Sequence, residues 1–444
     1  MPSRSARTPV LVALGALLLV VGVAPFVPRG GDDEGALQPS GGGGYVAGRA
    51  TSVGYGRVTP ALRAEVDRVV SEGRRLGRAL EQAPGKPRAY AARQVAAYVR
   101  CADFEGQRYC LGTGWTEDSE GQVRARTLAA IGTERGDRGR PTGDLDARAA
   151  LRRAATLTVD QRARAERAEL TMAARSVAKV WLLRHELEGV PLPAGFVTEH
   201  PEARVGTAQP GATAAATTPP TSTPTATLSP FVTPTPTPTQ ATTPTAPPTM
   251  PTTYDAYPES AAVLDTADVA EQERNYWCGP TAMQMIAWGW QDKYRSQDSW
   301  AKKLGTTGSG TSISSMVAVT NKRTGWDRPD YSGPYLALDI RHVSFDAWQL
   351  MVMDHVVNQR APMILHVQLL KLYFPYLDHD GSGHFQVGRG YDKRGVKPDL
   401  IGYFEPWNQQ RFHPDEPFIE RVQWRQSYRS YRATLAHYQH NVGV

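Results

Sequence analysis

The spacing of apolar residues predicts helices in the first half of the chain. Thr59 and Pro60 are typical of a helix start, with Thr as the N-cap and Pro in the first turn. The apolar residues that follow recur at helical spacing, and they are Leu62, Val66, Val69, Val70, Leu76 and Leu80. The same period predicts a second helix within 89–99 and a long third helix within 158–187. We therefore expect a mostly α-helical domain at residues 45–204.

The pattern changes in the last part of the chain. The residues after Cys278 have the spacing of a buried helix, with apolar positions at Ala282, Met283, Met285, Ile286 and Trp290. Short apolar or alternating runs at 362–367, 384–387 and 400–404 then predict strands. A helix followed by strands is typical of an α+β fold, which we expect for a domain at residues 254–444.

Two segments differ from these predicted domains in composition. Arg4 and Arg7 precede a run without polar side chains, so residues 1–29 are predicted to be a cleaved signal peptide or an N-terminal membrane anchor. Both alternatives place the rest of the chain outside the cytoplasm, secreted or anchored. Residues 205–253 are rich in Thr and Pro and carry no charged side chain, which predicts a disordered, semi-rigid linker.

Charge is distributed unevenly along the chain. The net charge is +6, but from Asp255 onward 20 basic side chains face 21 acidic ones, so the basic excess lies in the N-terminal half. This basic excess could favour binding to an anionic partner such as a cell-wall polymer or a membrane surface. Solvated Arg-rich helix faces explain it more simply. Basic and aromatic residues are not interleaved as in nucleic-acid-binding domains, and we expect no nucleic-acid partner.

The three cysteines divide into a pair and a remote residue. Cys101 and Cys110 are close in sequence, and in an oxidising compartment they predict one local disulfide that leaves Cys278 free. Their spacing is not that of a two-residue redox motif, and no further zinc ligands lie nearby. A thiol at the start of a helix lies near the positive end of the helix dipole, which favours the thiolate. Cys278 is therefore a candidate nucleophile, and we expect no cofactor.

A nucleophilic thiol needs a base and an oxyanion site. His384 is the candidate base, because a Gly-Ser-Gly run leads into it and a predicted strand would fix its ring. His366 and His355 are expected to be packed in the core. Gln272, six residues before Cys278, is a neutral amide that could donate a hydrogen bond to a developing oxyanion.

These motifs carry a resemblance to a known family. Gln272 followed by Cys278-Gly279-Pro280-Thr281-Ala282, together with the later run 384–392, resembles the bacteriocin-processing cysteine peptidases that act on double-glycine leaders, a papain-like family. The resemblance covers about the last 190 residues. It implies a papain-like fold, a peptide or protein substrate, Cys278 as nucleophile and His384 as base.

The third catalytic position departs from the family pattern. The family has Asp, or sometimes Asn, before a Pro, whereas this chain has Glu405 before Pro406. Glu405 is the predicted orienter of the histidine, with Asn408 as the alternative. The sequence thus predicts an exported thiol peptidase that works through an acyl-thioester. A catalytically silent peptide- or glycan-binding domain, acyl transfer to an amine, and the role of the helical domain stay open.

Overall fold

The computed structural model describes twelve stretches of the chain. They are residues 55–82, 87–133, 143–203, 252–264, 270–291, 294–323, 334–374, 380–381, 383–393, 400–404, 421–423 and 441–443. The predicted signal or anchor at 1–29 and nearly all of the predicted linker at 205–253 lie outside these stretches. In the part of the chain that the structure describes, no helix has the length and hydrophobicity needed to cross a bilayer.

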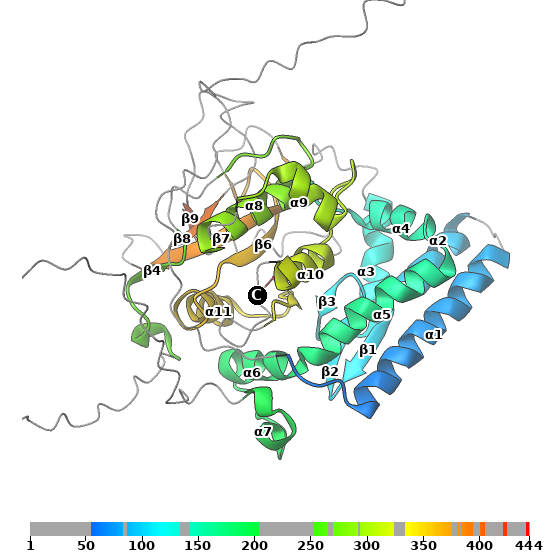
Figure 1. The fold of residues 1–444 in the computed structure, drawn as a ribbon, viewed down its shortest axis with the longest axis horizontal. Helices are drawn as coiled ribbons and strands as arrows, with labels where there is room; N and C mark the ends of the chain where they lie inside the picture. Colours follow the sequence, from blue (N-terminus) through cyan, green and yellow to red (C-terminus); the bar gives the residue numbers. More distant parts are fainter. Residues whose placement is uncertain are drawn as a thin grey trace, which may run out of the picture. The chain divides into compact units, whose positions relative to one another are not determined.

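The described residues form a mixture of helices and strands, compatible with an α+β fold (Figure 1). The α-helices are α1 (Pro60–Gln82), α2 (Pro87–Tyr98), α3 (Glu120–Thr133), α4 (Ala147–Ala155), α5 (Val159–Arg175), α6 (Val177–Glu188), α7 (Phe196–Glu199), α8 (Cys278–Gln291), α9 (Gln297–Leu304), α10 (Ile313–Arg323) and α11 (Phe345–Val357). The strands are β1 (Cys101–Phe104), β2 (Gln107–Cys110), β3 (Gly114–Trp115), β4 (Ser260–Ala262), β5 (Ala337–Asp339), β6 (Met363–Gln368), β7 (Gly383–Asp392), β8 (Leu400–Phe404), β9 (Arg421–Gln423) and β10 (Asn441–Gly443).

The first predicted helix begins where its cap residues indicate. Thr59 Oγ1 accepts a hydrogen bond from the backbone N–H of Leu62 at 3.2 Å, and α1 starts at Pro60. Its apolar side packs against α5, and the two helices lie side by side in Figure 1.

The long helix predicted within 158–187 is wrong in one respect, because the structure divides it into α5 and α6 at Ser176. Both the N–H and the Oγ of Ser176 donate to the carbonyl of Ala173, at 2.8 and 2.9 Å. Ser side chains compete in this way with the regular helical hydrogen bonds, and the backbone of Ser176 leaves the helical conformation.

The predicted disulfide between Cys101 and Cys110 is confirmed, and Cys278 is the free cysteine. The two bonded residues face each other in a hairpin of β1 and β2 that the helical pattern did not predict. Its turn has positive φ at Glu105 and Gly106 (55° and 82°), the conformation that suits a two-residue hairpin.

One sheet connects the N-terminal and C-terminal parts of the chain. Its strands run in the order β1-β2-β3-β5-β10-β6-β7-β8-β9, with β4 paired to β7. The join is the parallel pairing of Trp115 in β3 with Leu338 in β5. The buried apolar side chains on both sides of this join belong to one core that includes Leu62, Trp115 and Met283. The boundaries predicted for separate domains stay a prediction.

The predicted strands of the C-terminal part are present. The apolar run at 362–367 forms β6, which is buried along its whole length, and 400–404 coincides with β8. β6 and β7 are antiparallel neighbours, and α8 and α11 pack against β7. This arrangement places the helix that begins at Cys278 against the strand that carries His384.

Candidate active site

Cys278 is the first residue of α8, followed by Gly279 and Pro280 in the first turn. This is the helix start that the sequence predicted, since a Pro in the first turn sacrifices no helical hydrogen bond. The turn before it closes with the N–H of Trp277 donating to the carbonyl of Arg274 at 3.0 Å. Cys278 itself is fully buried, with an exposed fraction of 0%. The thiol therefore lies at a helix N-terminus and is closed off from solvent.

The loop before Cys278 is held by a buried glutamine that sequence reasoning missed. Gln297, at the start of α9, donates through Nε2 to the carbonyl of Glu271 at 2.7 Å. Its Oε1 accepts from the N–H of Glu273 at 2.9 Å, and Nε2 also reaches Gln284 Oε1 on α8 at 3.0 Å. Oγ1 of Thr281 on α8 donates to the same Oε1 at 2.8 Å, so a fully buried amide with four partners fixes the loop relative to α8. No short motif signals this residue, because its partners lie in the loop before Cys278 and on α8, 13 to 26 positions away.

Gln272 lies in the same loop and is also fully buried. Its Nε2 donates to the carbonyl of Arg274 at 2.9 Å, which orients the amide group. An amide nitrogen carries two protons, so one remains for a further acceptor. The guanidinium of Arg274 lies 4.4 Å from the ring centroid of Trp277, next to the thiol.

His384 is the second residue of β7 and is fully buried. In the register of the sheet it faces Val367 of β6, while His366 faces Phe385 and stacks on its ring at 4.5 Å. Because successive strand residues project to opposite faces, the two imidazoles leave the sheet on opposite sides. His366 is buried in the core region, and so is His355 on α11, whose ring meets Tyr335 edge-on.

A segment from the N-terminal part lies directly over the thiol. A Cβ atom built on Gly143 would be 2.8 Å from Cys278 Sγ and 2.7 Å from the carbonyl carbon of Tyr276. The φ angle of Gly143 is +117°, a conformation that disfavours other residues. The backbone of Gly143 therefore packs closely against the predicted nucleophile, which the sequence did not indicate.

The next residue of this segment meets a histidine of the sheet. Oδ1 of Asp144 lies 3.1 Å from Nε2 of His366, and each of the two side chains is 1% exposed. The pair joins the segment before α4 to β6, more than two hundred positions later in the chain. Sequence reasoning had placed His366 in the core without a carboxylate beside it.

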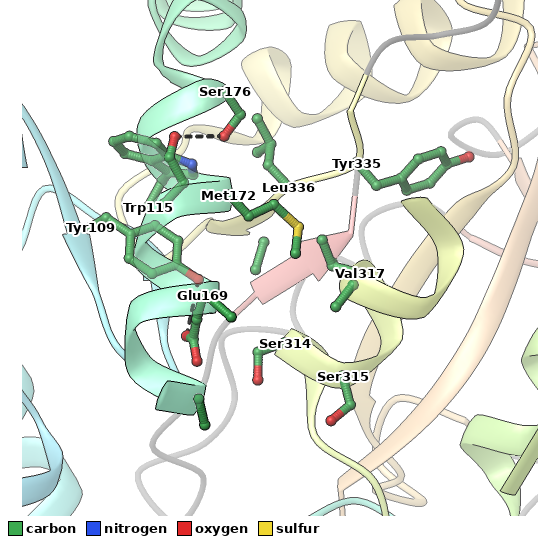
Figure 2. A pocket seen from close by; sticks show the side chains of 15 residues that line it. Tyr109, Trp115, Glu169, Met172, Ser176, Ser314, Ser315, Val317, Tyr335 and Leu336 are labelled. Carbon is green, nitrogen blue, oxygen red and sulfur yellow. Dashed lines mark hydrogen bonds between the residues drawn. The ribbon is translucent and has the colours of Figure 1, made fainter. Parts of the chain in front are cut away.

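A mostly apolar cavity is a separate feature. It has a volume of about 200 Å³ and lies between α5, α10 and β5 (Figure 2). Its wall is mostly apolar, and its carboxylate is Glu169, which accepts from Tyr109 Oη at 3.0 Å and from the N–H of Gly112 at 2.9 Å. Burial raises the pKa of Glu169. Neither Cys278 nor His384 lines this cavity.

The two predicted orienters, Glu405 and Asn408, lie outside the described residues. The described residues therefore include a free thiol at the start of a buried helix, an oriented amide in the loop before it, and a histidine on a strand against which that helix packs. This is the residue set of a cysteine peptidase-like domain.

The comparison with family models agrees with this class. Residues 265–434 match the model of the Peptidase_C39 like family, which supports a C39-type cysteine peptidase-like domain in this part of the chain. Residues 1–264 lie outside the match. No curated protein and no solved structure matches the chain significantly.

Proposed function

We propose that this protein is an exported thiol peptidase that hydrolyses peptide bonds. Cys278 Sγ attacks the carbonyl carbon of the substrate after His384 removes its proton. Gln272 and the backbone N–H of Cys278 donate hydrogen bonds to the oxyanion. The amine leaves with the proton from His384, and water then hydrolyses the acyl-thioester, which releases the acid and restores the thiol.

One observation carries the proposal. The free cysteine of the chain is the first residue of a buried helix, and this helix lies within the segment that matches a cysteine peptidase family. A peptidase of this class acts on a peptide or protein. Proximity of α8 to β7, the strand of His384, adds support for a thiol–imidazole pair.

Several finer points belong to the same proposal. The fold of the C-terminal part is papain-like, and Glu405, or Asn408 in its place, orients the imidazole. Residues 1–29 direct export or anchor the chain, so the substrate is an extracytoplasmic peptide. The basic N-terminal half is available for contact with wall polymers or lipid headgroups.

The assignment is tested with the full chain and a mixed peptide library analysed by mass spectrometry. Cys278→Ala and His384→Ala are expected to abolish cleavage, because they remove the nucleophile and its base. His355→Gln is the matched control, since it changes a buried histidine on α11 whose ring meets Tyr335. Products that persist in Cys278→Ala would contradict the proposal, and cleavage that persists in His384→Ala but is lost in His366→Gln would move the base to His366.

The rival is a catalytically silent domain that binds peptide or glycan. The observation in its favour is the complete burial of Cys278 and His384. One contact that buries Cys278 comes from the N-terminal part of the chain, where Gly143 packs against its sulfur.

A further inference from the structure

A peptidase thiol must come within about 3–3.5 Å of a carbonyl carbon of its substrate. Cys278 has no exposed surface, so an external peptide cannot reach it in this state. The contact that closes off the sulfur on one side is made by Gly143, which belongs to the N-terminal part and not to the matched peptidase segment. The cover and the thiol thus come from different parts of one chain.

The covering segment pairs through its backbone. The N–H of Thr311 donates to the carbonyl of Gly143 at 2.8 Å, and the N–H of Leu145 donates to the carbonyl of Thr311 at 3.0 Å. The two hydrogen bonds make a parallel β-bridge between Asp144 and Thr311. An extended peptide docks on an exposed backbone edge with the same pattern.

Thr311 lies beside the predicted nucleophile. A Cβ built on Gly279, the residue after Cys278, would be 2.7 Å from Thr311 Oγ1. A peptide that paired with Thr311 would therefore pass next to the sulfur, as Gly143 does. The hydrogen bonds that would position a substrate backbone there are already made by the protein's own chain.

Two side chains hold the segment, one at its middle residue and one directly after it. Asp144 contacts His366 at 3.1 Å, and Asp146 caps α4 by accepting from the N–H of Ala149 at 2.5 Å. The cap fixes the entry into α4, so the three residues before it are presented in a defined conformation.

From these contacts we infer that residues 143–145 are an internal inhibitor that occupies the peptide-binding strip beside Cys278. The inference rests on the proposed peptidase function and deepens it, because it makes the enzyme latent in this state. The competing ligand is an extended peptide that takes over the backbone hydrogen bonds of Thr311. The N-terminal part is then the regulatory part of the enzyme.

The test uses alkylation of the full chain by iodoacetamide under non-reducing conditions. Because Cys101 and Cys110 are bonded to each other, the label reports on Cys278. Gly143→Ala places a methyl group against Tyr276 and Cys278 and strains a positive φ, so the cover should open. We expect labelling of Cys278 to be about tenfold faster, with cleavage of the peptide library raised in parallel.

Gly189→Ala is the matched control. Gly189 also has a positive φ, +69°, but a Cβ there meets nothing within 4 Å, so the variant strains the backbone without a clash. A second variant, Asp144→Ala, removes the contact with His366 without adding bulk and should accelerate labelling in the same direction. It keeps the inference testable if Gly143→Ala fails to fold, which circular dichroism would detect.

The outcomes separate this inference from the proposed function. Labelling and cleavage that both rise in the two cover variants, but not in Gly189→Ala, support both. Faster labelling without cleavage in any variant keeps the cover and overturns the peptidase assignment. Rapid labelling and cleavage in the unmodified chain, unchanged by the variants, overturns the inhibitor and leaves the peptidase. A cut after Gly143 that disappears in Cys278→Ala also overturns it, because the segment is then a substrate.

Discussion

Among the contacts between the N-terminal part and the peptidase-like part, two differ in their chemistry. At one of them Asp118 is surrounded by Arg126 at 2.7 Å, Arg341 at 3.0 Å and His342 at 2.7 Å. Arg126 also reaches Asp339 of β5 at 2.6 Å. Burial alone would raise the pKa of Asp118, but the hydrogen bond from His342 and the positive charges around it lower that pKa overall.

The contact over Cys278 is built mainly from backbone. Its two hydrogen bonds join Gly143 and Leu145 to Thr311, and one carboxylate–imidazole contact supports them. A net backbone hydrogen bond contributes about 1 kcal/mol, whereas breaking a buried ion pair costs about 3–5 kcal/mol. Any peptide backbone can replace the first kind of contact, but nothing outside the chain replaces the second. We call the ion-pair cluster of Asp118, Arg126, Asp339, Arg341 and His342 the anchor, and residues 143–145 the cover. The difference indicates that the anchor persists, whereas a substrate peptide can take the place of the cover.

The largest effect is expected when the anchor is broken. Arg126→Ala leaves the buried carboxylates of Asp118 and Asp339 without their shared partner, so the free energy of unfolding should fall by about 3–5 kcal/mol. Urea denaturation followed by tryptophan fluorescence measures the loss. The control is Lys302→Ala, which removes the exposed pair with Asp298 and should cost less than about 1 kcal/mol. Equal losses in the two variants would show that the buried cluster is no anchor.

A smaller, pH-dependent effect is expected at Lys179, a further contact between the two parts. Its ammonium donates to the carbonyl of Pro334 at 3.2 Å. Burial lowers the pKa of Lys179 from 10.5 to about 7, although the charges of Asp354 and Glu186 oppose this shift. His355 also lies close to the amine. In the unfolded chain this amine stays protonated up to about pH 10. Between about pH 7 and 10 the unfolded state therefore binds more protons, so stability rises with pH.

Lys179→Met removes the amine that takes up a proton when the protein unfolds at this pH. Relative to the unmodified protein, the variant should gain stability on the order of 2 kcal/mol at pH 6, and the gain should shrink towards pH 9. Thermal melting of both proteins at the two pH values measures the difference. A gain that does not change with pH would assign the effect to packing and not to the charge.

The smallest expected effect is confined to the cover. Gly310→Ala places a Cβ 2.6 Å from the carbonyl carbon of Gly143 and forces a residue with a side chain to adopt φ +99°. We expect alkylation of Cys278 to be about five- to tenfold faster, with urea denaturation shifted much less than in Arg126→Ala. Gly195→Ala is the control, since its nearest neighbour is a Glu199 oxygen at 3.9 Å. If Gly310→Ala lowered global stability as much as Arg126→Ala, cover and anchor would be one cooperative unit.

Much of the local structure could be predicted from the sequence. The start of α1 follows from a Thr cap and a Pro, β6 and β8 from short apolar runs, and the disulfide from two nearby cysteines. The break at Ser176 could not, because the apolar period continues across it and a side-chain hydrogen bond decides the conformation. The hairpin between the cysteines was also missed, since its strands are only four residues long.

The candidate site divides in the same way. Cys278, His384 and Gln272 were named from motifs, and their catalytic roles stay predictions. Gln297 and Asp144 were not named, because each acts through partners that are distant in sequence. Glu405 and Asn408 lie outside the described residues, so the choice between them is a matter for mutagenesis.

By itself, the sequence determined the elements and the candidate nucleophile, because capping, hydrophobic period and cysteine spacing act between residues a few positions apart. The tertiary structure decided that β3 pairs with β5, that Thr116 of the N-terminal part donates to Asp339 across 223 positions, and that Gly143 covers Cys278. Such contacts depend on how whole elements pack, and no local pattern encodes which distant backbone will fill the space beside a thiol.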